Sequence, residues 1–215
     1  MNYDLMKLFL TSSCIPKNLR EPFLAFLGKP PEQIKLFFIP TASDVEDNKF
    51  YTCQSMDDFS AVGIDPIWYS LRFKTKEQIA RELATADVVW VNGGNTFYLL
   101  DAARRTGFME IVSKLVRDCR VMYGGTSAGS ILASPTIAAA GWGGDGADKN
   151  AVGLTDLASF GFVPFTTHVH YDPAIEKDEL LANKRGTPIY AVPDGCAIQV
   201  ENEKIVTLGD VEIFD

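Results

Sequence analysis

Apolar segments alternate with amphipathic ones along the first two thirds of the chain. The apolar segments are short and continuous, which is typical of strands buried on both faces of a sheet. The amphipathic segments place apolar residues at helical spacing, and Thr75 with Gln78 can form a capping box at the start of one of them. We expect strands at 7–12, 34–39, 64–69, 87–91 and 121–123, and helices at 18–27, from 43 or 44 to about 61, at 75–84, 96–105 and 108–118.

This alternation predicts an α/β fold, a doubly wound, mostly parallel sheet with helices on both faces. After Pro135 a long segment rich in Gly, Ala and Asp covers 136–156, and loops of that length are usually functional or mobile. We expect further strands at 161–170 and 190–193, and a C-terminal β-hairpin of 197–201 and 204–208 with Asn202 in its turn. The chain has no internal repeat or linker-like tract, so we expect a single domain over 1–215.

The motif Gly125-Thr126-Ser127-Ala128-Gly129 follows the apolar run at 121–123 and precedes a segment of small and apolar residues. A Gly-x-Ser-x-Gly motif between a strand and a helix is typical of a nucleophile elbow. The sharp turn strains the backbone at the serine and leaves no room for side chains two residues to either side. We therefore expect Ser127 to be an exposed nucleophile, with the amide of Ala128 directed at an oxyanion. A glycine-rich turn with an ordinary serine is the alternative.

A serine hydroxyl needs a base to take its proton, and the sequence contains two histidines, His168 and His170. Both lie at the end of the expected strand 161–170, on the sheet edge where doubly wound folds bind ligands and where Ser127 lies. On a strand the two side chains would point to the same face. Each could instead be a structural, hydrogen-bonded histidine, or the two could bind a metal. No third ligand lies at a suitable spacing, so we expect no metal site.

The base in turn needs a carboxylate that holds its tautomer. Asp172, Asp194 and Glu201 lie near the ends of later strands, and Asp194 directly follows the expected strand 190–193. The loop Gly93-Gly94-Asn95 also follows a strand and can supply a second amide, because glycine permits close backbone approach. A phosphate-binding turn is the alternative for this loop. Its spacing is not Gly-x-Gly-x-x-Gly, so we do not expect a dinucleotide, and we expect no cofactor.

Composition narrows the class of protein. The 215 residues are 47% hydrophobic with a formal net charge of −8, which suits a globular domain and argues against nucleic acid or an anionic membrane surface as a partner. The four cysteines are scattered, as is typical of reduced thiols in a cytosol. The first residues lack the features of a signal peptide, and no stretch reaches the roughly 20 apolar residues of a membrane span. We expect a cytoplasmic protein.

Several motifs together resemble the peptidase E (aspartyl dipeptidase) and cyanophycinase family. They are Asn92-Gly93-Gly94-Asn95-Thr96-Phe97, Gly125-Thr126-Ser127-Ala128-Gly129, Ser134-Pro135-Thr136, a histidine six residues after Pro164, and Pro193-Asp194-Gly195-x-x-Ile198-Gln199-Val200. Members are serine peptidases with a class I glutamine amidotransferase-like α/β fold. The resemblance implies Ser127 as nucleophile, His170 as base, and oxyanion-stabilising amides at Gly94 and Ala128. Around these we place the substrate-binding residues Gly93, Asn95, Thr126 and His168.

The third member of the site departs from the family pattern. The acid of the Pro-acid-Gly motif is usually glutamate, and here it is Asp194, whose side chain is one methylene shorter. In some members an acid after the Ser-Pro-Thr segment has been given a triad role. That position is Trp142 here, and the nearest acids are Asp145 and Asp148. We favour Asp194.

The expected specificity also departs from the family. Aspartyl dipeptidases carry an arginine between the histidine and the Pro-acid-Gly motif, where it can grip an acidic side chain with paired hydrogen bonds. The corresponding segment, 172–190, is shorter and offers Lys177, Lys184 and Arg185 outside any matching motif. We therefore do not carry Asp-X specificity over to this chain.

The sequence as a whole predicts a serine peptidase that cleaves dipeptides or short peptides through Ser127, His170, Asp194 and an acyl-enzyme. Its expected partner is a small peptide substrate, with the segment 141–150 as a lid or specificity loop, and a homo-oligomer is left open. Two alternatives remain. One is hydrolysis of another small amide or isopeptide at the same site, and the other is a catalytically silent binding protein with this fold.

Overall fold

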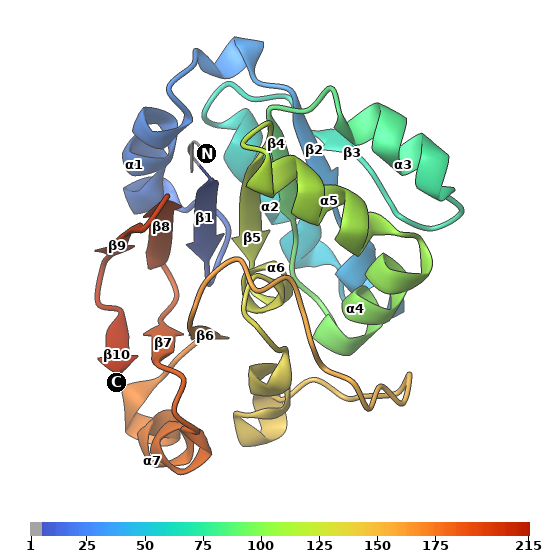
Figure 1. The fold of residues 1–215 in the computed structure, drawn as a ribbon. Coiled ribbons are helices and arrows are strands. Elements are labelled where there is room, and N and C mark those ends of the chain that lie inside the picture. The colour runs from blue at the N-terminus through green and yellow to red at the C-terminus, as the bar shows by residue number, and fades with distance from the viewer. Residues whose placement is uncertain (1–5) are drawn as a thin grey trace.

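The computed structural model describes residues 6–215 and is organised around a seven-stranded sheet of order β3-β2-β4-β5-β1-β8-β9 (Figure 1). From β3 to β1 the neighbouring strands in this order are parallel, and β8 and β9 form an antiparallel hairpin at one edge. The expected α/β class, mostly parallel sheet and C-terminal hairpin are thus confirmed. The strands are β1 Lys7–Thr11, β2 Leu36–Ile39, β3 Ile67–Trp68, β4 Val88–Val91, β5 Met122–Thr126, β8 Ala197–Glu201 and β9 Lys204–Leu208.

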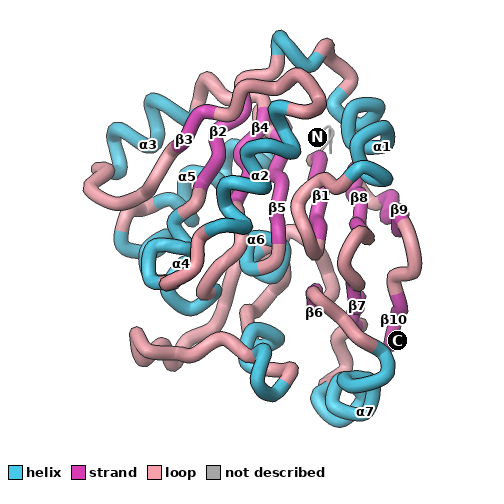
Figure 2. Tube along the Cα trace, turned by 180° about the vertical axis from the view of Figure 1, so that it is seen from behind, coloured by secondary structure: helices cyan, strands magenta, loops and turns pink. Residues whose placement is uncertain are grey.

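Helices cover both faces of this sheet (Figure 1 and Figure 2). Phe9 and Trp90 point to one face and pack with α1 and α2, whereas Leu8 and Val91 point to the other and pack with α3, α4 and α5. Successive strand residues alternate between the faces, so burial of both faces requires the continuous apolar runs seen in the sequence. The helices are α1 Lys17–Leu27, α2 Phe50–Ser60, α3 Lys76–Leu83, α4 Thr96–Arg105 and α5 Phe108–Arg117.

A second, three-stranded sheet lies beyond the carboxyl ends of β1 and β5 (Figure 1). Its order is β10-β7-β6, with β6 (Thr166–Val169) parallel to β7 (Ile189–Val192) and β10 (Glu212–Phe214) antiparallel to β7. The helix α7 (Pro173–Asn183) joins β6 to β7 and packs Leu180 into a small apolar cluster with this sheet. This arrangement brings the end of β6 to the same edge as the end of β5.

The second helix starts later than expected. Residues Thr41–Val45 form a separate 3-10 turn, in which the hydroxyl of Ser43 donates to the carbonyl of Pro40. The α-helix α2 therefore begins at Phe50 rather than at 43 or 44. By contrast, the capping box of Thr75 and Gln78 at the start of α3 is confirmed, because each side chain accepts from the other residue's backbone amide.

Two strands, β3 and β6, are shorter than expected by four residues or more, and β6 lies in a different sheet. β3 covers Ile67–Trp68 instead of 64–69, and Pro66 before it has no N–H to donate to the sheet. The strand expected at 161–170 is β6, which covers Thr166–Val169 and belongs to the second sheet. Gly161, with a φ of +56°, turns the chain before it.

Two elements were not expected at all, α7 and β10. The start of α7 carries a readable signal, because Asp172 accepts from the amide of Ala174 and Pro173 occupies the first helical turn. β10 has three residues and pairs with β7, so its sequence alone gives little periodicity. Among the described residues, 6–215, no helix is long and apolar enough to cross a membrane.

Candidate active site

Ser127 lies at the turn between β5 and α6 (Ala128–Leu132), and its backbone has the unusual angles φ 52° and ψ −113°. A non-glycine residue at such angles is strained, as expected for an elbow. The two glycines of the motif are required because other backbone atoms lie too close to them to leave room for a side chain. A Cβ on Gly125 would lie 2.6 Å from the carbonyl carbon of Gly129, and one on Gly129 would lie 2.0 Å from the carbonyl oxygen of Val91. The fold therefore holds the serine in a conformation that lifts it from the sheet edge.

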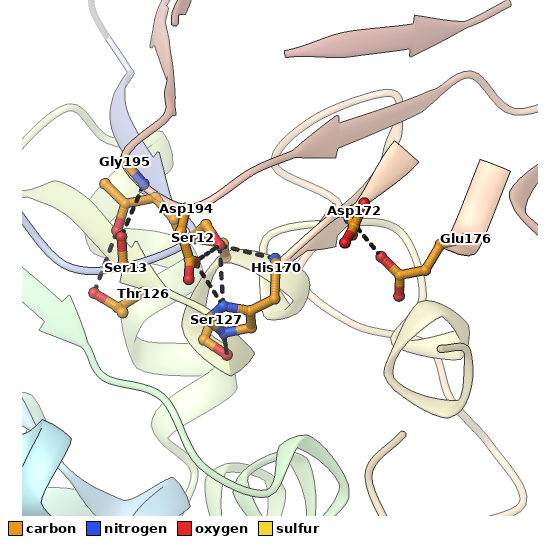
Figure 3. A network of polar contacts seen from close by, with 11 residues as sticks. Ser12, Ser13, Thr126, Ser127, His170, Asp172, Glu176, Asp194 and Gly195 are labelled. Carbon is orange, nitrogen blue, oxygen red and sulfur yellow. Dashed lines mark hydrogen bonds and ion pairs between the residues drawn. The ribbon is translucent and has the colours of Figure 1, made fainter. Parts of the chain in front are cut away.

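His170 follows the last residue of β6 and faces Ser127 (Figure 3). Its Nε2 lies 3.0 Å from Oγ of Ser127, and its Nδ1 lies 2.7 Å from Oδ1 of Asp194. The backbone of His170 is left-handed, with a φ of 56°, so strand alternation ends before it. The expectation that both histidines point to one face assumed that both lie on the strand, and His170 lies beyond its end. His168 is buried within β6, whereas His170 is turned towards the serine.

Asp194 lies in the loop between β7 and β8 and contacts the imidazole directly, without a bridging water. The hydrogen bond from His170 is the largest cause that lowers the pKa of Asp194, and Ser12 adds to it. Asp194 is therefore a carboxylate throughout the neutral range. Gly195 fixes this loop in place. Its amide donates to the hydroxyl of Ser13, and its carbonyl accepts from the side chain of Asn18.

Ser12 is a member of this network that the sequence analysis overlooked (Figure 3). It follows β1 and is completely buried. Its hydroxyl donates to Oδ1 of Asp194 at 2.7 Å and accepts from the backbone amide of His170 at 2.8 Å. The sequence feature that could have identified Ser12 is the polar run of residues 11–13, which lies at the carboxyl end of a strand that neighbours β5 in the sheet. Ser12 thus links the imidazole and the carboxylate to the main sheet.

The amides assigned to the oxyanion lie in the loop after β4, at Gly94, and at the start of α6, at Ala128. No hydrogen bond joins the amide of Gly94 or of Ala128 to another described residue. Gly94 has a φ of 129°, and a Cβ there would lie 2.4 Å from the carbonyl carbon of Ala42. A Cβ on Gly93 would lie 3.0 Å from Cβ of Ser127. Gly93 therefore permits a close approach to the serine, and Gly94 permits a close approach to the backbone of Ala42, which a larger residue would block.

The other residues placed in the substrate-binding surface have structural partners. The side chain of Asn95 caps α4 by accepting from the amide of Tyr98. Thr126 is buried and accepts from the indole of Trp90. His168 is buried with its Nε2 3.2 Å from Oε1 of Glu176. Burial is the largest cause that lowers the pKa of His168, so this imidazole is neutral at neutral pH.

Asp148, the alternative to Asp194 as the carboxylate beside His170, has a different hydrogen-bond partner. Its Oδ2 accepts from the amide of Thr96 at 2.7 Å and thereby joins the segment 141–150 to the start of α4. No hydrogen bond links it to His170 among the described residues. Burial raises the pKa of Asp148. The side chain of Asp145 lies outside the described part of the structure.

A cavity of about 520 Å³ opens beside Ser127, and a smaller one of about 160 Å³ shares Ser127 and His170 with it. The larger lies between the segment after β1, the helix α2, the Gly93-Gly94 loop and the segment 141–150. Cys14 also lines it, but burial raises the pKa of this thiol to about 12, so it remains protonated and does not compete as a nucleophile. The volume suits a small ligand such as a short peptide.

Comparison with known proteins relates this chain to peptidases. The model of peptidase family S51 matches residues 8–208. An uncharacterized peptidase of Pasteurella multocida is 31% identical over 208 residues, which cover 95% of this chain and 98% of that protein. Peptidase E of Streptomyces coelicolor is 29% identical over 194 residues, 85% of this chain and 74% of that protein. A Listeria monocytogenes crystal structure, described as a candidate peptidase E, superposes with a TM-score of 0.79 at 27% identity, covering 95% of this chain and 98% of that one.

Proposed function

The chain belongs to peptidase family S51, and we propose that it is a serine exopeptidase that cleaves dipeptides or short peptides through an acyl-enzyme. Membership of the family makes it a serine peptidase and a dipeptidase-like hydrolase. One observation carries the roles of individual residues, the unbroken line of hydrogen bonds from Asp194 through His170 to Ser127. A carboxylate, an imidazole and a hydroxyl in this order are what acyl transfer from a serine requires.

The first half of the proposed reaction forms the acyl-enzyme. Nε2 of His170 takes the proton of Ser127 as Oγ bonds to the substrate's carbonyl carbon, and the carbonyl oxygen becomes an oxyanion. The imidazolium then gives this proton to the departing amine. The carbon–nitrogen bond breaks, the carbonyl re-forms, and an ester joins the acyl group to Ser127.

The second half releases the acid. His170 takes a proton from a water molecule, whose oxygen attacks the ester carbon and forms a second oxyanion. The imidazolium returns the proton to Oγ of Ser127 as the carbon–oxygen bond of the ester breaks. The free carboxylic acid leaves, and the site is restored.

We assign stabilisation of both oxyanions to the amides of Gly94 and Ala128. The absence of a described protein partner for either amide supports this assignment, because such donors must be available to the substrate. Preorganised amides of this kind are each worth about 3–4 kcal/mol of transition-state stabilisation.

Asp194 holds the proton of His170 on Nδ1, so that Nε2 is free to accept from Ser127. The family's usual glutamate is longer, but the 2.7 Å contact supports a direct role for the shorter acid. We assign Ser12 a positioning role, since its hydroxyl fixes the carboxylate and the backbone of His170 together. The likeness to the class I glutamine amidotransferase fold remains a prediction from the motifs.

Labelling with a fluorophosphonate probe tests the nucleophile. We expect the wild-type protein to be labelled at Ser127, and Ser127→Ala and His170→Ala not to be labelled at an appreciable rate. Equal labelling of Ser127→Ala would refute the proposed nucleophile. Dipeptide hydrolysis that is lost in His170→Ala would separate a peptidase from a silent binding protein with the same fold.

A further inference from the structure

The walls of the two cavities that meet at Ser127 carry an excess of negative charge. Glu46, Asp58 and Asp148 line the larger cavity, and Glu176 lines the smaller one. None of the residues that line either cavity is lysine or arginine, as far as the described chain extends. His168 in the smaller cavity is neutral at neutral pH because burial lowers its pKa. A substrate's negative side chain would therefore find no cation in these walls.

Three of these carboxylates already have partners. Asp58 forms an ion pair with Arg20, whose Nη2 lies 3.1 Å away. Asp148 accepts from the amide of Thr96, and Glu176 contacts His168. The carboxylate of Glu46 has no hydrogen bond or ion pair recorded with any other residue in the described range. It is half-buried on the cavity wall and thus available to a ligand.

Tyr51 gives a second, independent sign that this wall faces a polar ligand. Its hydroxyl oxygen is buried and has no hydrogen-bond partner among the described residues, and the residue lines the larger cavity. Burial is the main reason that the pKa of Tyr51 is raised to about 12, and the charges of Glu46 and Asp148 add to it. Tyr51, Glu46 and Asp148 all line this one cavity. Oxygen acceptors grouped in this way suit an ammonium or a guanidinium group.

From this wall we infer that the site takes peptides with a basic side chain, lysine or arginine, next to the scissile bond, and that Glu46 binds the positive group. The inference rests on the proposed function, because it concerns the substrate of that same site. An aspartyl side chain in the same position would meet carboxylates of like charge without a compensating cation, and such juxtapositions oppose binding. The family resemblance alone would favour acidic substrates, so the two expectations are opposite.

A matched set of dipeptides tests the charge preference. It consists of Lys-Ala, norleucyl-Ala, Asn-Ala and Asp-Ala, together with the reversed Ala-Lys, Ala-norleucine, Ala-Asn and Ala-Asp. In one of the two orientations we expect kcat/KM for lysine to exceed that for norleucine by about tenfold, and aspartate to fall below asparagine by a similar factor. The lysine preference should shrink in 0.5 M salt, because partly exposed charges are screened. Aspartate equal to or better than asparagine, in both orientations, would overturn the inference.

Substitution of Glu46 identifies the residue responsible. Glu46→Gln keeps the size of the side chain and removes its charge, so we expect kcat/KM for the lysyl substrate to fall by about 5- to 10-fold and that for the norleucyl substrate to fall less. Glu203→Gln is the matched control, since Glu203 is an exposed acid in the turn between β8 and β9 and lines neither cavity. An equal fall with both substrates in Glu46→Gln would contradict a role in charge recognition.

The test separates failure of this inference from failure of the proposed function. If the fluorophosphonate does not label Ser127, the proposed function fails first. If Ser127 is labelled and aspartyl peptides are preferred, the peptidase stands and the charge inference falls. Where turnover is too slow to measure, the same dipeptides compete against labelling, and stronger protection by the lysyl than by the norleucyl and aspartyl peptides supports the inference. Equal protection by all three overturns it.

Discussion

The hydroxyl of Ser12 lies 2.7 Å from Oδ1 of Asp194, although 182 positions separate these residues in the sequence. Ser12 follows the first strand of the main sheet, and Asp194 follows a strand of the second sheet. The same hydroxyl accepts from the backbone amide of His170. This one contact therefore ties the two sheets together at the point where the proposed base and its carboxylate meet.

Loss of the Ser12 hydroxyl should slow catalysis without removing any group that touches the substrate's reacting atoms. In Ser12→Ala we expect kcat to fall by about 10- to 100-fold, the scale of a lost hydrogen bond to a charged group, with a smaller change in KM. The pKa of Asp194 should rise, because a hydrogen bond that lowers it is gone, and titration of this carboxylate measures the change.

Two variants control this prediction. Ser12→Thr retains a hydroxyl and should recover part of the rate, and Ser60→Ala removes an exposed hydroxyl that bonds only within its own helix. If the pKa of Asp194 is unchanged in Ser12→Ala and Ser12→Thr recovers nothing, Ser12 fills space rather than positioning His170 and Asp194.

The identity of the third member can be decided by two isosteric substitutions. Asp194→Asn keeps the shape but cannot hold the Nδ1 tautomer, so we expect kcat to fall by about 10³-fold or more. Asp148→Asn should leave kcat within about tenfold, because its hydrogen bond goes to the amide of Thr96 rather than to the imidazole. Steady-state rates on one dipeptide compare the two. A larger loss in Asp148→Asn than in Asp194→Asn would exchange their roles.

Gly94 should tolerate no side chain. Its φ of 129° is unfavourable for other residues, and a Cβ would lie 2.4 Å from the backbone of Ala42. We expect Gly94→Ala to lower the free energy of unfolding by about 2–4 kcal/mol and to reduce the rate of probe labelling. Gly153→Ala is the control, because Gly153 has a φ of 71° and nothing within 4 Å of its Cβ position. That variant should lose about 1 kcal/mol and keep its labelling rate.

Burial of His168 predicts a pH dependence of stability. Its folded-state pKa lies below the ordinary value of 6.5, so below pH 6.5 the unfolded chain binds a proton that the folded chain does not. The free energy of unfolding should therefore be highest above this pH and decline as pH falls from 6.5 towards the folded-state pKa, by at most about 1.4 kcal/mol per pH unit. Urea unfolding at pH 7.0 and pH 5.5 measures the decline.

A variant separates the contribution of His168 to this pH dependence from that of carboxylates that titrate in the same pH range. His168→Gln removes the titrating ring, and its difference in stability between the two pH values should be smaller than that of the wild type. An unchanged difference would mean that His168 is not the source.

Local sequence determined much of the fold. The continuous apolar runs became strands buried on both faces, Thr75 and Gln78 formed their capping box, and the glycines around Ser127 permitted the elbow. The apolar runs and the capping box depend on how many faces of a segment are buried or on contacts between residues a few positions apart, and a linear pattern contains that information. The glycines are read directly from the motif.

Tertiary structure alone decided how the site is assembled and what it faces. The left-handed backbone of His170 and the contacts of Asp194 with Ser12 and His170 all depend on how a second sheet sits against the first. The acidic wall at Glu46 arises because separate segments converge on one cavity. Such contacts join residues far apart in the chain, and their distances follow from packing and strand order, which no local pattern of polar and apolar residues specifies.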